Sequence, residues 1–228
     1  MTEGFSQSES SFDLIASMPT TAQIYRCSEG LLAKCLEAKP TPECVAIVRK
    51  NYRDWQPLVS GGATPLWVGI DQGENADNLG MLLRSAEAAG VDGVLLAGGT
   101  VDAWGRRVVR AARGAMFSLR MSTHNSTLEA VEIAQSAGVQ VISTSAKATE
   151  TYTEVDYCLP TMILVGNEHH GIEEAVVERS DRCVYIPMLG HIHSLNIAVA
   201  ASLMLYEAQR QRGWISPKST LQKSVSPP

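Results

Sequence analysis

Apolar and polar positions alternate in blocks from residue 66 onward. Short apolar runs, rich in β-branched residues, occur at "LWVGID", "GVLLAG", "FSLRMS", "VQVIST", "TMILVG" and "CVYIP". Between these runs the apolar positions follow helical spacing, which predicts helices over 78–89, 105–115, 126–137, 171–179 and 195–211. Strand-like runs that are apolar on both faces and alternate with helices are typical of a buried parallel sheet. The pattern predicts an α/β fold, with a parallel sheet flanked by helices.

The two ends of the chain differ from this regular block. Residues 1 to about 13 and the end of the chain are rich in Ser, Pro and Gly, which predicts poorly ordered tails. The intervening N-terminal part holds a helical stretch, "SEGLLAKCLEA", and one apolar run, "CVAIV", with breakers around them. We expect a partly disordered N-terminal extension at 1–62, a main domain at 63–212 and a flexible basic tail at 213–228.

Composition narrows the class of protein. The hydrophobic share of 45% and the charged share of 19% are ordinary for a soluble globular protein, and no apolar run reaches the roughly 20 residues of a membrane helix. The first residues are acidic where a signal peptide has a basic start. Five scattered cysteines without a CxxC pair favour reduced thiols. We therefore expect a cytoplasmic protein with no membrane segment.

Charge limits how the protein could bind nucleic acid. The net charge is -5, so an RNA-binding function would depend on a local basic patch. In "WGRRVVRAARGAM", Arg106, Arg110 and Arg113 have the i, i+4, i+7 spacing of one helix face. This face is either an RNA-binding surface or an ordinary solvated helix face, and charge patterning alone leaves both open.

The first polar block, "DQGENADNLGMLLRSAEAAG", directly follows a predicted strand. The carboxyl ends of parallel strands are where such sheets bind ligands. Asn78 stands where a helix N-cap is expected, and Gly80 leaves space for something to approach the helix. An apolar stripe along the helix sets Arg84 on the opposite side, free to face a cleft. The alternative is a capped surface helix with an ordinary arginine.

The second block, "ILVGNEHHGIEEAV", runs from a predicted strand into a helix. Gly166 and Gly171 enclose Asn167 and Glu168 and predict a tight turn whose backbone comes close to a ligand. The glycine spacing is neither that of a dinucleotide-binding loop nor that of a P-loop. The alternative is a simple turn carrying an exposed acid.

The third block, "IPMLGHIHSLNIAVAASLMLYE", is a strand end, a loop and a helix that is apolar almost all round. Such a helix is expected to lie in a core or in a subunit interface. Ser194 is a natural N-cap, and Asn196 in the first turn needs a hydrogen-bond partner. That partner is either a ligand or the local backbone.

The histidines raise a competing hypothesis of a metallohydrolase. His169 and His170 follow one predicted strand and His191 and His193 follow the next, so with Glu168 they could form a zinc site. Adjacent histidines on a turn rarely reach one metal, however, and the sequence has no HExxH helix. We expect no metal.

Taken in order, "NLGMLLR", "GNEHHG" and "IPMLGHIHSLN" resemble the blocks of the SpoU/TrmH family of RNA ribose 2'-O-methyltransferases, in the SPOUT superfamily. The resemblance covers about residues 66 to 210, and three ordered blocks at predicted strand ends are far more specific than any one alone. It implies a C-terminal deep trefoil knot, a homodimer and S-adenosylmethionine as cofactor. It also implies that tRNA or rRNA is the substrate.

The resemblance further implies catalytic residues. Arg84 matches the arginine proposed to activate the ribose 2'-hydroxyl, and Asn78 and Glu168 would position it and the reacting groups. Ser194 and Asn196 would shape the knot loop and the ribose pocket. Arginine keeps its proton in proteins, so orientation of the hydroxyl, with help from an RNA phosphate, fits this residue better than simple deprotonation.

By the same resemblance, the cofactor is held by backbone at Gly166, Ile186 and Leu195, with help from the strand end at Thr144. Apolar walls suit an adenine ring. The alternative that keeps the same fold is a knotted RNA-binding protein that has lost catalysis.

Overall fold

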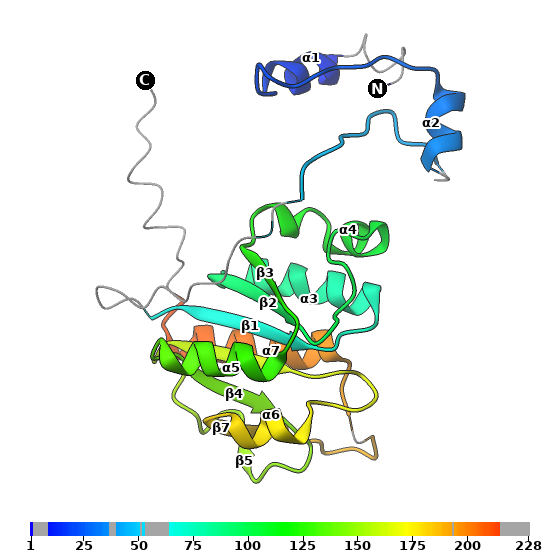
Figure 1. Cartoon of the computed structure of the whole chain (residues 1–228). Helices are drawn as coiled ribbons and strands as arrows, with labels where there is room; N and C mark the ends of the chain where they lie inside the picture. The colour runs from blue at the N-terminus through cyan, green and yellow to red at the C-terminus, as the bar shows by residue number, and fades with distance from the viewer. Residues whose placement is uncertain (2–8, 37–39, 51, 53–63, 193, 215–228) are drawn as a thin grey trace. The chain divides into compact units, whose positions relative to one another are not determined.

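The computed structural model describes residues 1, 9–36, 40–50, 52, 64–192 and 194–214. The chain divides into two compact units, Met1–Lys50 and Asn51–Pro228. The first unit holds α1 (Glu9–Ala16) and α2 (Glu29–Leu36) (Figure 1). The helix α2 lies in the predicted helical stretch, whereas α1 begins inside the predicted N-terminal tail, which is a correction for residues 9–13. The predicted C-terminal tail lies outside the described residues from 215 onward.

Within the described ranges, the second unit is built on a seven-stranded parallel sheet in the order β3-β2-β1-β6-β4-β7-β5. This confirms the predicted α/β fold. The elements in chain order are β1 (Leu66–Asp71), α3 (Ala76–Ala88), β2 (Gly93–Ala97), α4 (Arg106–Ala112), the 3₁₀ helix η2 (Ala115–Phe117), β3 (Met121–His124), α5 (Thr127–Ser136), β4 (Gln140–Thr144), β5 (Glu150–Thr151), β6 (Thr161–Val165), α6 (Glu174–Arg179), β7 (Arg182–Tyr185) and α7 (Ile197–Gln211).

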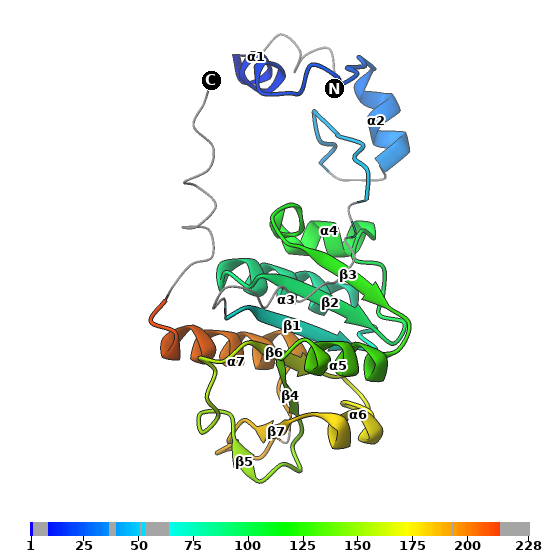
Figure 2. The same ribbon diagram turned by 60° about the vertical axis from the view of Figure 1, so that its left-hand side comes forward.

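Helices cover both faces of the sheet (Figures 1 and 2). In β1, Leu66, Val68 and Ile70 point to a core shared with α3, α4 and α7, whereas Trp67 points to a second core shared with α5 and α6. Side chains alternate between the faces of a strand, so a strand buried on both faces has to be apolar at every position. This is why the sequence shows continuous apolar runs where a half-exposed sheet would show alternation.

Two local departures from the predicted elements have backbone causes. The helix α4 ends at Ala112, short of the predicted 115, because Arg113 and Gly114 have positive φ angles of 53° and 91°. This left-handed backbone cannot continue a right-handed helix. The run "FSLRMS" is a strand only from Met121, since Phe117 ends η2. The two-residue edge strand β5 was not predicted.

Tyr52 belongs to the second unit and packs against its sheet, although the predicted N-terminal extension runs to residue 62. It forms a β-bridge with Met121, its hydroxyl donates to Asp102 Oδ1 at 3.0 Å, and its ring meets Trp104 edge to face. Burial is the main cause that raises the pKa of Tyr52 to about 12, with the hydrogen bond to Asp102 and the charge of that carboxylate adding to it. These contacts tie the start of this unit to the β3 edge of the sheet.

The end of α7 is fastened by Arg212. Its guanidinium donates to the carbonyl oxygens of Tyr157 at 2.7 Å and Leu159 at 2.8 Å, and to that of Thr64. These carbonyls belong to the loop before β6 and to the residues leading into β1, so one side chain joins three segments. None of the helices in the described ranges is both long and apolar enough to cross a membrane. All five cysteines are free thiols.

Candidate functional site

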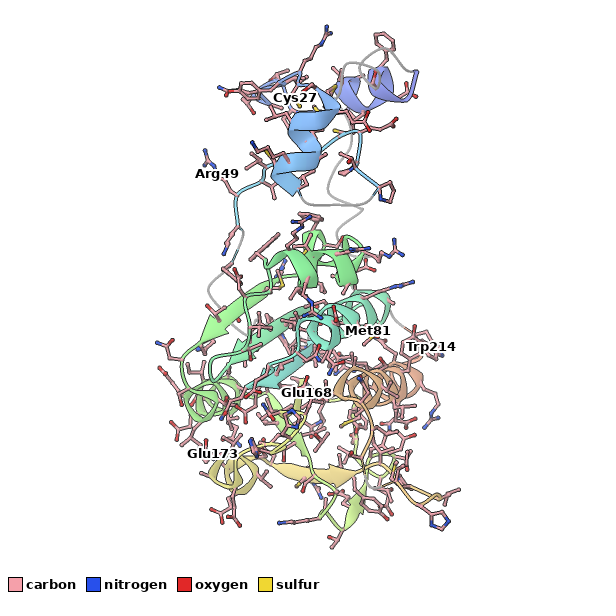
Figure 3. The ribbon with its side chains drawn as sticks, turned by 90° about the vertical axis from the view of Figure 1, so that its right-hand side faces the viewer. Cys27, Arg49, Met81, Glu168, Glu173 and Trp214 are labelled. Atoms are coloured by element: carbon pink, nitrogen blue, oxygen red, sulfur yellow. The ribbon has the colours of Figure 1, made fainter. Side chains whose placement is uncertain are left out.

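The three sequence blocks meet at the carboxyl ends of the strands. The Asn78 side-chain amide donates to Glu168 Oε1 at 2.9 Å, and the Asn196 side-chain amide donates to Asn78 Oδ1 at 2.8 Å. The partners are 90 and 118 positions apart in the chain. Asn78 lies on α3, Glu168 follows β6 and Asn196 precedes α7, so one hydrogen-bonded chain, Glu168–Asn78–Asn196, joins all three blocks. Figure 3 labels Glu168 in this region.

The helix caps differ from the prediction. Asn75 caps α3, since its Oδ1 accepts from the amides of Asp77 and Asn78 at 2.9 and 3.1 Å. Asn196, not Ser194, caps α7, because Asn196 Oδ1 accepts from the Ala198 amide at 2.9 Å. The predicted caps at Asn78 and Ser194 are therefore wrong. With Asn75 as the cap, the Asn78 side chain is available for Glu168 and Asn196.

The turn that carries Glu168 is organised by Asn167, which the sequence placed in the turn without predicting a role for its side chain. Its side chain is buried, and its Oδ1 accepts from the amides of His169 and His170 at 2.7 and 3.2 Å. Its Nδ2 donates to the carbonyl of Gln72, just after β1, at 2.8 Å. An Asn whose side chain bonds the backbone two residues on is a known turn former, and that signal was present in "GNEHHG".

Gly166 is required by the turn itself. A Cβ at this position would stand 2.2 Å from the carbonyl carbon of Gly171 and 2.4 Å from the amide of Ile172. Gly171 has a φ of 72°, in the left-handed region that favours glycine. The tight turn is confirmed, but the backbone that approaches Gly166 is that of its own turn.

One carboxylate oxygen of Glu168 lacks a partner. Oε1 accepts from Asn78, whereas Oε2 is buried and has no hydrogen bond to any described residue. Buried polar atoms without a partner are rare in folded proteins, because each loses its hydration without compensation. This oxygen is free to accept a hydrogen bond from a substrate group or from water.

Arg84 is not joined to this chain of amides. Its side chain is exposed, as the buried apolar stripe of α3 predicts, and it forms no hydrogen bond or ion pair within the described residues. At about 100° per residue, the six positions from Asn78 to Arg84 place the two side chains roughly 120° apart around the helix. Within one chain, Arg84 therefore points away from the Asn78 face.

The space at Gly80 is occupied by protein. A Cβ on Gly80 would stand 2.3 Å from Ala111 Cβ and 2.9 Å from the Val108 carbonyl oxygen, both on α4. The prediction that Gly80 leaves room near Arg84 is thus corrected: the approaching group is the neighbouring helix. Close helix packing at glycine is the physical reason, since it lets the two backbones come together.

Three of the four predicted cofactor residues lie at the carboxyl ends of neighbouring strands. Thr144 ends β4, Gly166 follows β6 and Ile186 follows β7, three strands that are neighbours in the sheet, while Leu195 lies just before α7. Gly166 and Ile186 stand beyond the last paired residues of their strands. Backbone groups that follow the paired part of a strand are available to form hydrogen bonds with a ligand. Together with the half-buried apolar side chains of Ile186 and Leu195, they suit a flat aromatic ring with polar edges, such as adenine.

The basic segment surrounds a hollow of about 420 Å³ lined by Asp77, Arg107, Arg110, Ala111 and Arg113. Arg107 is paired with Asp77. Two of the three predicted RNA-binding residues, Arg110 and Arg113, line it. Arg106 is exposed and does not line it, whereas its neighbour Arg107 does.

The histidines do not form a cluster where they are described. Among the described residues, no three His, Cys, Asp or Glu side chains come together as a metal site requires. His169 and His170 are exposed neighbours with ring centroids 6.3 Å apart, and His191 is exposed. His193 lies outside the described residues.

Comparison with known proteins identifies relatives of the whole block. The chain is 36% identical over 150 residues to a putative TrmH family tRNA/rRNA methyltransferase of Staphylococcus saprophyticus, over 66% of this chain and 60% of that relative. It is 32% identical over 189 residues to a 23S rRNA (guanosine(2553)-2'-O)-methyltransferase of Bacillus subtilis, over 83% of this chain and 73% of the relative. The chain thus spans less than two thirds of the first of these proteins.

The fold is shared with solved structures. The SpoU methyltransferase AviRb from Streptomyces viridochromogenes, in complex with the cofactor AdoMet, matches with a TM-score of 0.77 and 30% identity, over 90% of this chain and 79% of that one. A model of the SpoU rRNA methylase family matches residues 65–206, which include the sheet, the Glu168–Asn78–Asn196 chain and all three sequence blocks. The chain belongs to the SpoU rRNA methylase family.

Proposed function

We propose that this protein transfers a methyl group from S-adenosylmethionine to a ribose 2'-hydroxyl of tRNA or rRNA. The observation that carries the proposal is the hydrogen-bonded chain Glu168–Asn78–Asn196, which brings the three blocks of the family to one place. Similar proteins named as 2'-O-methyltransferases of 23S rRNA and of tRNA guanosine 18 support the reaction and the two substrate classes.

The strand ends at Thr144, Gly166 and Ile186, with Leu195, would hold the cofactor, through backbone groups beyond the ladder and through apolar side chains. When bound, S-adenosylmethionine supplies a methyl group activated by a positively charged sulfur. The protein's own contribution is to place the ribose oxygen in line with that methyl group, because orientation accounts for much of the barrier lowering in group transfer.

The polar side chains would position the ribose. The free Glu168 Oε2 accepts a hydrogen bond from a donor of the substrate, and the two asparagines fix that carboxylate through Oε1. Arg84 would donate to the ribose oxygen or to an adjacent phosphate, which orients the hydroxyl for attack, and the RNA phosphate would take the hydroxyl proton as the methyl group is transferred. Ser194, exposed before α7, contributes a hydroxyl at the same loop.

The resemblance to the family also predicts that the C-terminal part of the chain forms a trefoil knot. Its support comes from the path of the chain after β7, which lies beside β4 and β5. The helix α7 then packs back on α3 and β6, and Asn196 bonds Asn78 at the start of α3. A limited-proteolysis and refolding study would test this, since a knotted chain refolds slowly from a fully unfolded state.

A homodimer is supported by an exposed apolar stripe. Val199, Leu203 and Tyr206 repeat at helical spacing along α7, and Met81 lies on the adjacent α3, each between 40 and 48% exposed. Figure 3 labels Met81 where α3 and α7 lie side by side. Exposed apolar side chains that line up along two packed helices are typical of a subunit interface. We propose that a second copy of the chain covers it.

In such a dimer Arg84, three positions from Met81 on α3, would face the partner's site. This accounts for its orientation away from Asn78 within one chain. Mixing Arg84→Ala chains with Glu168→Gln chains tests the arrangement. If sites are shared between subunits, random mixing restores about a quarter of the normal activity, because half of the dimers are mixed and each has one intact site. No restoration would place Arg84 and Glu168 in the same chain's site.

The decisive experiment for the activity is transfer of labelled methyl from S-adenosylmethionine to tRNA and rRNA that lack 2'-O-methyl groups, followed by mapping of the labelled nucleotide. We expect incorporation at a single ribose. Arg84→Ala is the matched control, and we expect it to lose methylation while still binding RNA. Full methylation by this variant would refute the role of Arg84. RNA binding without methylation by the unaltered protein would favour the catalytically inactive alternative.

A further inference from the structure

The arginine hollow lies where α4 packs on the start of α3. Arg107 and Arg110 share one face of α4, Arg113 follows its end, and Asp77 lies in the first turn of α3. The contact of Gly80 with α4 fixes the two helices closely at this place. The hollow is therefore a concave surface built by helix packing.

The hollow carries a surplus of positive charge. Asp77 pairs with Arg107, but Arg110 and Arg113 form no hydrogen bond or ion pair with any described residue. Three guanidinium groups against one carboxylate leave two net positive charges around the hollow. In a protein of net charge -5, like charges gathered this closely repel one another unless an anion joins them.

The backbone at Arg113 adds an independent observation. Its φ of 53° is left-handed, an uncommon conformation for a residue with a side chain. Helices often end in a residue with this conformation. Here it ends α4 and directs the chain so that Arg113 lies beside Arg110 at the hollow.

We propose that this hollow binds a phosphate of the substrate RNA backbone, with Arg110 and Arg113 as the main contacts. This inference rests on the proposed function and gives the site a specific ligand group. Guanidinium forks match phosphate oxygens in geometry and charge. A volume of about 420 Å³ is in the range of ligand sites, roughly 300 to 1,000 Å³, and holds a phosphate together with part of its nucleotide.

Among the described residues, Asp77 is the one acidic side chain that lines the hollow. By pairing with Arg107, it lowers the surplus positive charge at the hollow. Asp77→Asn would leave Arg107 free, so we expect tighter RNA binding with a steeper dependence on salt and weaker discrimination between RNAs.

The test measures RNA binding by the full chain at several salt concentrations, with substrate RNA identified by the methylation assay or, failing that, unmodified tRNA. We expect Arg110→Gln with Arg113→Gln to weaken binding at least tenfold at moderate salt. The slope of the logarithm of affinity against the logarithm of salt should fall by about 1 for each phosphate that the variant no longer binds.

Two further variants locate the effect. Arg179→Gln removes a surface arginine of α6, on the opposite face of the sheet, and should leave the slope unchanged. Arg106→Gln removes the exposed neighbour that does not line the hollow, and should change the slope clearly less than Arg110→Gln. If Arg106→Gln and Arg110→Gln changed the salt slope equally, the proposed phosphate site in the hollow would be wrong, and RNA would instead contact a diffuse basic face.

The same measurements separate the possible sources of phosphate. Titration with inorganic phosphate and with a nucleoside monophosphate, for the unaltered protein and for the double variant, shows whether a free anion is held. If these bind through Arg110 and Arg113 while RNA affinity is the same in both proteins, the RNA inference is wrong. Failure of methyl transfer would leave the binding slopes measurable, so the proposed function and this inference can fail separately.

Discussion

The Asn196 side-chain amide lies 2.8 Å from Asn78 Oδ1, and this contact joins the first turns of α7 and α3 across 118 positions of the chain. Asn196 uses its other side-chain atom to cap α7. Its amide group thus serves the helix and the site together, although the side chain is exposed at the surface. Any ligand that approaches Glu168 meets a carboxylate already held by this pair.

Replacing Asn196 with Asp separates these two tasks. Asp is as good an N-cap as Asn, so we expect the free energy of unfolding to change by less than about 1 kcal/mol. The donor to Asn78 disappears, however, and a second carboxylate is placed near Glu168. We expect methyl transfer to fall about 10- to 100-fold, measured as turnover of labelled methyl into RNA.

Ser202→Ala is the control for that variant. It removes the 2.7 Å contact between the hydroxyls of Ser202 and Ser85, which also joins α7 to α3 but lies away from Glu168. We expect turnover within twofold of normal. Equal losses in the two variants would mean that helix docking matters, and not the amide at the site.

Glu168→Gln tests the unpartnered oxygen. Glutamine keeps an oxygen for the amide of Asn78 and replaces the buried, unpaired Oε2 with a donor. The neutral amide of glutamine costs less to bury than a carboxylate with an unpaired oxygen, so we expect the melting temperature to stay the same or rise. Methyl transfer at saturating RNA and cofactor should fall at least tenfold. A variant that is more stable and fully active would show that Oε2 accepts nothing in the reaction.

Arg212→Ala should destabilise the second unit by about 2 to 4 kcal/mol, since it leaves three carbonyls, from two segments, without their charged donor. Denaturant unfolding followed by tryptophan fluorescence measures this. Arg210→Ala is the comparison, because Arg210 is mostly exposed and pairs only with Glu207 on its own helix. That change should cost about 1 kcal/mol or less. Similar losses in both would contradict the fastening role of Arg212.

Gly80→Ala should destabilise the packing of α3 on α4 by about 1 to 3 kcal/mol, because the new methyl group would overlap Ala111 and the backbone at Val108. Thermal unfolding gives the measurement. Adding Ala111→Gly removes the nearest atom but not the backbone contact, so we expect partial recovery. An unchanged melting temperature in the single variant would show that the helices separate easily.

Stability at high pH should depend on Tyr52. The folded pKa of about 12 is above the ordinary 10.0, so the protonated phenol is favoured in the folded state. Its contribution is fully present below pH 10 and is lost as the pH rises through 12. The difference in ultraviolet absorbance between the unaltered protein and Tyr52→Phe should titrate near pH 12. A midpoint near the ordinary 10.0 would mean that the ring is not held against Trp104 and Asp102.

Much of the fold was predictable because its causes are local. The apolar runs that became β1 and β6 are strands buried on both faces, and helical spacing predicted α3, α5 and α7 to within two residues at each end. The predictions that were wrong, the cap of α3 and the end of α4, also concern local structure, but they depend on the backbone conformation of single residues. Asn75 and Asn78 both suit a cap, and only the backbone path selected Asn75. The end of α4 depended on the φ angle of Arg113.

The sequence by itself determined the alternation of strands and helices, the three polar blocks at strand ends and the basic segment. Only the tertiary structure decided that Asn78 bonds both Glu168 and Asn196, that Glu168 Oε2 has no partner among the described residues, and that α4 fills the space at Gly80. Periodicity and capping act over a few residues and can be read along the chain. Hydrogen bonds between groups 90 and 118 positions apart exist only once the sheet has brought its strand ends together.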